Sequence, residues 1–153
     1  MTPFSLIIWK TDTGEIVSSP RYAVSDEFKE AMLLSALAPF GDDYSAMETT
    51  AQVDPASHHI HTVRGVPEVA ARPAMRILIK NGKTTLVANG VDTVELTGLP
   101  NPCTIVQDPG EPEETSYEVT GGGFVFSAET PGKYQFRVDR FPFLPFSVEF
   151  TAT

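Results

Sequence analysis

Three histidines, His58, His59 and His61, form the group of side chains in this chain that most resembles a reactive site. Residues two apart in a strand share a face, so His59 and His61 would lie about 7 Å apart. Two imidazoles together with Asp54 could in principle hold zinc. No Cys or Glu stands nearby at a ligand spacing, and zinc ligands also need outer groups that orient them. We therefore expect exposed or turn-capping histidines and no metal.

Cys103 is the only cysteine, so no disulfide can form within the chain. A reactive thiol needs surroundings that lower its pKa, and the neighbouring Pro102 and Thr104 supply none. We predict a small, buried, apolar side chain at this position.

Two loops carry groups that could bind ions or phosphate. The acidic residues 108–114 could attract calcium, but their prolines and irregular spacing favour a solvated loop. Gly121-Gly122-Gly123 lacks the helix and lysine that follow a phosphate-binding loop, and its context predicts a flexible hairpin turn. No nucleophile elbow or metalloprotease helix is present. We predict no catalytic residues, no cofactor and no metal.

The apolar segment from Phe141 to Phe146 contains two prolines, which cannot donate to a strand ladder. If it is exposed, Phe141, Phe143 and Leu144 form a patch suited to protein docking. The alternative, which we favour, is a loop tucked over the end of the C-terminal domain.

The elements of the N-terminal part begin with a strand over 4–10 and a reversal at Asp12-Thr13-Gly14. A helix over 26–38 follows, with Ser25 as its N-cap and Pro39 and Gly41 at its end. Phe28, Ala31, Met32 and Ser35 share one face of this helix, and Leu33, Leu34 and Leu37 broaden the apolar stripe toward its C-terminal end. We expect this stripe to pack on the hairpin; the alternative is a helix that binds a partner.

A second pair of strands is predicted over 44–52 and 60–67, around the turn-forming Asp54-Pro55. Arg64-Gly65 could make a further small reversal. The segment 67–73 begins and ends with proline and is expected to be an extended connector. The predicted domains are therefore residues 1–73 and residues 74–153.

The C-terminal part has short strand patterns separated by turn dipeptides such as Asn81-Gly82 and Pro131-Gly132. Tyr134, Phe136 and Val138 alternate with polar residues, as expected of strands with one buried face. Eight strands in fewer than 80 residues predict a compact sandwich. The strands are expected over residues 76–80, 84–88, 91–96, 103–107, 116–120, 124–128, 134–138 and 146–151.

The net charge of −9 is spread over both halves of the 153-residue chain. No cluster of Lys and Arg exists to neutralise phosphates, so we expect no nucleic-acid partner. The apolar run 4–9 is too short for a membrane span or a signal-peptide core. We expect a chain that folds in the cytoplasm and has no membrane partner.

Short motifs along nearly the whole chain resemble small virion proteins of tailed bacteriophages. The N-terminal motifs are Thr13-Gly14-Glu15-Ile16, Asp54-Pro55-Ala56-Ser57-His58 and Arg72-Pro73. The C-terminal motifs are Leu96-Thr97-Gly98-Leu99-Pro100 and Pro131-Gly132-Lys133-Tyr134. The segment from Thr130 to Phe136 also resembles the turn and penultimate strand of immunoglobulin-like domains. The expected fold is mainly β: a small hairpin-plus-helix (α+β) module, then an immunoglobulin-like antiparallel β-sandwich.

This resemblance implies a non-enzymatic virion protein, present in several copies and folded in the host cytoplasm. Its expected partners are other virion proteins of the tail, fibre or major capsid, with the N-terminal module docking and the sandwich projecting. Two alternatives remain: a capsid decoration protein that cements the head, and a carbohydrate-binding or adhesion module that contacts a host surface glycan. Stacking aromatics for such a glycan site are suggested only at Trp9, Phe141 and Phe143.

Overall fold

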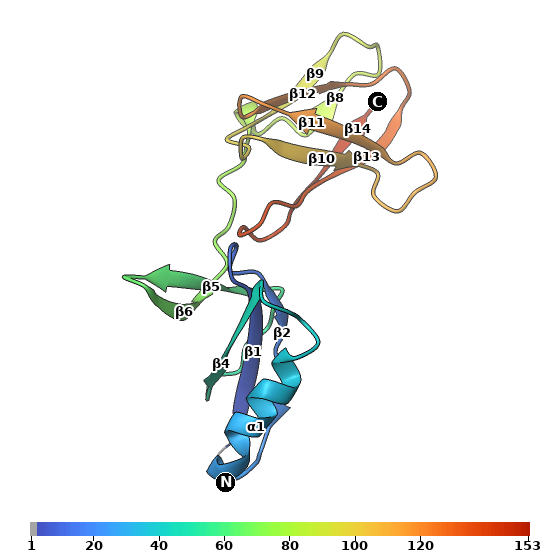
Figure 1. Cartoon of the computed structure of the whole chain (residues 1–153). Helices are drawn as coiled ribbons and strands as arrows, with labels where there is room; N and C mark the ends of the chain where they lie inside the picture. The colour runs from blue at the N-terminus through green and yellow to red at the C-terminus, as the bar shows by residue number, and fades with distance from the viewer. Residues whose placement is uncertain (1–2) are drawn as a thin grey trace. The chain divides into compact units, whose positions relative to one another are not determined.

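The computed structural model describes residues 3–153, which divide into two compact units. The first unit ends at Arg72, and the second runs from Pro73 to Thr153, so the boundary falls one residue before the predicted one. These residues hold fourteen strands, one α-helix and one short 3-10 helix, and the fold is mainly β (Figure 1).

The first unit is built around one central strand, β1 (Phe4–Lys10), whose first six residues are all buried. β1 pairs antiparallel with β4 (Tyr44–Thr49) on one side, and with β2 (Ile16–Ser18) and β3 (Arg21–Tyr22) on the other. A strand covered on both faces needs a nearly continuous apolar run, which the sequence Phe-Ser-Leu-Ile-Ile-Trp provides.

Different side chains pack on the two faces of β1. Ile7 and Trp9 belong to a core cluster with Ile16, Val53 and Ile60. Side chains alternate along a strand, so Phe4, Leu6 and Ile8 point to the opposite face. On that side, the ammonium of Lys29 lies 5.1 Å from the centre of the Phe4 ring.

The helix α1 (Asp26–Leu37) forms where the sequence predicts it, but two details of the prediction are wrong. The Ser25 side chain makes no capping hydrogen bond to the helix backbone. The inward face consists of half-buried Lys29, Met32, Leu33, Ala36 and Leu37, whereas the predicted Phe28, Ala31 and Ser35 are exposed. The long lysine stem covers the sheet while its ammonium reaches Asp26 at 2.9 Å, so a charged residue supplies part of the packing face.

A separate hairpin follows, made of β5 (His58–Val63) and β6 (Val66–Ala71). The predicted pairing of 44–52 with 60–67 is wrong, because β4 pairs with β1 and β5 pairs with β6. The expected connector 67–73 is also mostly strand β6. The reversal at Arg64-Gly65 is confirmed, with φ of 51° and 81° at these two residues.

The second unit is a sandwich of two sheets. One sheet has the order β11-β10-β13-β14-β8, in which β8 joins β14 in parallel, and the other has the order β12-β9-β7. β9 and β12 pair in one sheet while β10, β13 and β14 lie in the other, the arrangement of an immunoglobulin-like sandwich. The elements are β7 (Leu78–Ile79), η1 (Lys80–Gly82), β8 (Thr85–Leu86), β9 (Thr93–Thr97), β10 (Cys103–Gln107), β11 (Thr115–Val119), β12 (Gly123–Ser127), β13 (Gly132–Val138) and β14 (Phe146–Ala152).

The sandwich core follows the predicted alternation. Phe136, Val138 and Phe150 are buried, and Tyr134 packs against them while its hydroxyl donates to the Thr130 carbonyl at 2.7 Å. One turn prediction is wrong. Gly121-Gly122-Gly123 is not a hairpin turn, because β11 and β12 lie in different sheets and the glycines cross between them.

Candidate functional site

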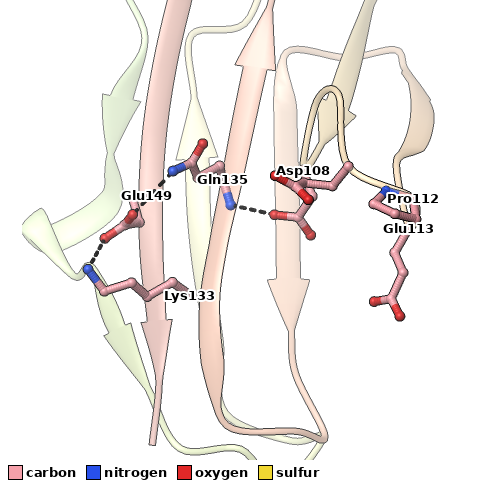
Figure 2. Close-up of a pocket in the computed structure, with 7 residues that line it drawn as sticks. Asp108, Pro112, Glu113, Lys133, Gln135 and Glu149 are labelled. Carbon is pink, nitrogen blue, oxygen red and sulfur yellow. Dashed lines mark hydrogen bonds and ion pairs between the residues drawn. The ribbon is translucent and has the colours of Figure 1, made fainter.

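The second unit has an open hollow of about 430 Å³ on the polar face of its larger sheet (Figure 2). Strand alternation turns Lys133 and Gln135 of β13 and Glu149 of β14 toward solvent, opposite the core side chains. The loop between β10 and β11 forms the other wall. The lining residues are Asp108, Glu111, Pro112, Glu113, Lys133, Gln135 and Glu149.

Backbone pairing fixes the positions of these polar groups. Gln135 lies directly opposite Glu149 in the β13–β14 register. Asp108 extends the ladder beyond β10: its N–H donates to the Gln135 carbonyl at 2.7 Å, and its carboxylate accepts the Gln135 N–H at 2.9 Å. Asp108 has a φ of 49°, a left-handed conformation that Asp tolerates better than most residues.

The charges in this hollow are largely paired. Lys133 lies 3.1 Å from the Glu149 carboxylate, and the Gln135 amide donates to the same carboxylate at 3.5 Å. The Lys133 bond first, and then the Gln135 bond, hold the pKa of Glu149 below its usual range. A carboxyl that donates a proton at neutral pH needs a raised pKa, so Glu149 is unsuited to that role. This hollow can bind a polar group more readily than it can transfer a proton.

The acidic loop is closed by its own backbone. The Glu114 carboxylate accepts the Gly110 N–H at 2.7 Å, and the Glu111 N–H donates to the Asp108 carbonyl at 3.1 Å. Glu114 therefore turns toward the loop backbone. Within residues 3–153, no group of three or more His, Cys, Asp or Glu side chains is arranged to hold a metal ion.

The three histidines lie on β5, as their spacing suggests, but they do not act as one group. The Nδ1 atom of His58 lies 2.9 Å from the Ser57 hydroxyl and 3.2 Å from the Asp54 carbonyl, at the turn before the strand. The rings of His59 and His61 share a face, with their centres 6.3 Å apart. Burial first, and then the charges of His61 and Arg72, lower the pKa of His59.

A second hollow, of about 560 Å³, lies in the first unit and was missed by the sequence analysis. The β1–β4 register pairs Lys10 with Tyr44, so the loops after β1 and before β4 meet at one edge. Lys10 is engaged by Glu15 at 2.6 Å. The lining residues are Lys10, Thr11, Asp12, Asp42, Asp43 and Tyr44. The adjacent pair Asp42-Asp43 was the only sign of this hollow in the sequence. Asp12 is distant in sequence and is brought near the pair only by the pairing of β1 with β4.

The proposed docking residues Phe141, Phe143 and Leu144 are half-buried in the loop between β13 and β14. The Phe143 N–H donates to the Arg140 carbonyl, and the Leu144 N–H donates to the Pro73 carbonyl, both at 2.8 Å. These bonds hold the loop against the start of the second unit. Whether this surface binds a protein stays a prediction.

Cys103 begins β10 and is 5% exposed. Burial raises the pKa of its thiol, which keeps the sulfur protonated at neutral pH. The predicted role as a small, buried, apolar side chain is confirmed. None of the helices in residues 3–153 is long and apolar enough to cross a membrane.

Comparisons with known proteins give little further information. No protein-family model matches the chain, and no curated protein matches it. The chain is similar to two solved structures of glycosyl hydrolase family 2 members from Bacteroides cellulosilyticus, each 12% identical, with TM-scores of 0.35 and 0.34. The matches cover 97% and 96% of this chain but only 21% and 23% of those chains, so it spans less than a quarter of their length. Likenesses this weak carry no argument, and function must be argued from the residues themselves.

Proposed function

We propose that this chain is a non-enzymatic structural protein of a tailed-bacteriophage particle, associated with the tail or its fibres. The first unit attaches the protein to the particle, and the sandwich serves as a spacer or a weak adhesion domain. The proposal begins from the resemblance of the sequence motifs, among them Thr13-Gly14-Glu15-Ile16 and Pro131-Gly132-Lys133-Tyr134.

The observation that carries the proposal is the apolar surface of the first unit. Phe28 and Leu34 on the outer face of α1 are 59% and 66% exposed. Val63 and Val66 at the tip of the β5–β6 hairpin are 40% and 57% exposed. Four exposed large apolar side chains, on the outer face of α1 and at the hairpin tip of so small a unit, favour a protein that is held by larger partners.

The chemistry of the polar groups also supports a binding role. The carboxyl groups with a clear shift, Asp26, Asp92 and Glu149, all have pKa values below their usual range because a lysine neighbours each one. Such carboxylates stay ionised as partners in salt bridges. Catalytic acids are tuned in the opposite direction.

Many copies on a symmetric particle would compensate for weak single contacts. Linked binding events raise the overall affinity without any new contact, provided that the geometry allows simultaneous engagement. A small unit that offers only open hollows in its described residues, 3–72, is suited to that arrangement.

The experiment is cryo-electron microscopy of particles that carry the gene, with the protein identified in purified virions by mass spectrometry. Density on the tail or fibres would support the proposal. Density only on the shell lattice would replace it with the capsid decoration role, and absence from purified particles would reject both. A glycan array probed with the isolated protein provides a separate check, because strong specific binding would favour the adhesion alternative.

A virion variant sharpens this experiment. Phe28→Ser with Leu34→Ser should reduce incorporation into particles without unfolding the protein, because both side chains are exposed. Val125→Ser is the matched control, since Val125 is 58% exposed on the second unit. Equal incorporation of both variants would show that α1 is not part of the attachment surface.

A further inference from the structure

The outer half of the β5–β6 hairpin, residues 61–68, is an arm whose root is fixed and whose tip is exposed. At the root, Ile60 is 4% exposed within the core cluster, and its N–H donates to the Gly14 carbonyl at 2.8 Å. Along the arm every residue is exposed except Pro67, which is half-buried. Figure 1 shows β5 and β6 running away from β1 and β4.

The tip of the arm has a defined shape and charge. Arg64 and Gly65 both have positive φ, which is the conformation of a two-residue hairpin turn that matches strand twist. Val63 and Val66 are directly paired across this turn and therefore share a face. The tip thus presents two valines beside one cation, and Arg64 makes no ion pair within residues 3–153.

An isolated two-stranded ribbon is at best marginally stable in water, so the arm would gain from a partner. Strand addition along β6 is a poor solution, because Pro67 cannot donate a hydrogen bond. Docking through the side chains of the tip fits the exposed valines and the arginine better.

The acidic hollow of the first unit has the complementary charge. Asp12, Asp42 and Asp43 line it and make no ion pair in the part of the chain that the structure describes. Its one lysine, Lys10, is neutralised by Glu15. Half-buried Tyr44, whose ring lies 5.3 Å from that of Phe40, is the aromatic residue among those that line the hollow. The hollow is open to solvent and has a volume of about 560 Å³.

We propose that the arm tip of one copy of this chain docks into the acidic hollow of a second copy. Arg64 lies against the carboxylates of Asp12, Asp42 and Asp43, and Val63 and Val66 cover the ring of Tyr44. The fixed root directs the tip away from the sheet that forms the hollow of its own copy, so the partner is another molecule. Repetition of this contact closes a dimer or a ring, depending on the rotation between copies.

The contact can be tested in solution by sedimentation velocity of the full chain at low and high salt. We expect self-association that weakens with salt, because the pairing is between exposed charges. Arg64→Glu should weaken it about tenfold or more, and Asp42→Lys with Asp43→Lys should do the same. Arg21→Glu, which makes the same charge change at an exposed position of β3, is the matched control.

Mixing the two charge-reversed variants gives the decisive result. Each variant then meets a matching partner: the acidic arm of the Arg64→Glu variant faces a lysine-bearing hollow, and the unaltered arm of the other variant faces an intact acidic hollow. We expect the mixture to associate as the unaltered chain does, while each variant alone stays weaker. Restoration would be hard to explain by misfolding of either variant.

A chain that stays monomeric at every concentration and salt level overturns this inference, as does Arg64→Glu behaving like Arg21→Glu. These outcomes concern contacts between copies in solution. They leave the proposed particle function to be decided by microscopy, so the two can fail separately.

Discussion

Gly14 joins two parts of the first unit at a single backbone position. It has a φ of 79°, and a Cβ atom built there would lie 2.0 Å from the Ile60 carbonyl oxygen. The residue therefore permits both the reversal after β1 and the approach of β5. The hairpin signal in the sequence explained the first role, and only the structure revealed the second.

Gly14→Ala should destabilise the first unit by about 3 kcal/mol, combining left-handed strain with displacement of the β5 backbone. Gly41→Ala is the matched control: Gly41 has a φ of 81° and open space where its Cβ would be. It should cost only about 1 kcal/mol. Urea unfolding followed by circular dichroism would measure both variants, and equal losses would show that the contact with Ile60 matters little.

We expect His59 to make the first unit less stable in acid. Its pKa is lowered in the folded state, so the unfolded chain takes up a proton first as the pH falls. The stability linked to His59 is present above its ordinary value of 6.5 and is lost as the pH falls through the folded pKa. Burial of the ring lowers the pKa of His59 most, and the charges of His61 and Arg72 add to this effect.

We expect the urea concentration at the unfolding midpoint to decrease when the pH is lowered from 7.5 to 5. The decrease should be smaller in His59→Gln. Asp26 titrates lower, from an ordinary value of 3.8, so it does not contribute in this window. An identical pH dependence in the unaltered chain and in the variant would contradict the role of His59.

At the scale of elements, α1 shows how a weakly amphipathic helix can be assigned to the wrong face. Apolar residues occur around most of its circumference, and Phe28 suggested the inward side. The sheet receives Met32 and Leu33, which belong to the predicted stripe, and also Lys29, which does not. Lys29 contacts the Phe4 ring of β1 and lies 3.9 Å from Glu48 of β4, and these contacts cannot be seen in the helix sequence.

This orientation predicts opposite effects for neighbouring leucines. Leu33→Ala should cost about 1–2 kcal/mol because its side chain is half-buried, whereas Leu34→Ala should change stability by less than about 0.5 kcal/mol. Both substitutions favour the helix equally, so propensity cancels in the comparison. Thermal unfolding would measure the stability that each variant loses. A larger loss for Leu34→Ala than for Leu33→Ala would mean that the opposite face of the helix contacts the sheet.

At the scale of the whole molecule, the second unit contains its own core. Its buried cluster comes entirely from residues 86–152 and includes Phe136 and Phe150. A fragment of residues 73–153 should therefore fold alone, with one cooperative unfolding transition. Dispersed amide signals in a proton–nitrogen NMR spectrum would show this.

Phe136→Ala in that fragment should cost about 3–5 kcal/mol, because the side chain is 1% exposed, whereas Val125→Ala should cost less than about 0.5 kcal/mol. A fragment without dispersed signals, or equal effects of the two substitutions, would count against a self-contained sandwich.

The sequence alone determined most of the strands and the two-part organisation. Alternation of buried and exposed side chains is a local signal, and β1 and β10 have the bounds expected from it. The immunoglobulin-like sandwich could be anticipated because turn dipeptides separate eight short apolar patterns. These signals depend on residues that are close in sequence.

Tertiary structure alone decided which strands pair and which charges meet. β4 pairs with β1 although β5 is nearer in sequence, because β1 requires a partner on each side and cover on each face. That pairing brings Asp12 to Asp42 and Asp43 in the acidic hollow. Contacts between distant residues depend on the packing of the whole unit, and no local pattern encodes them.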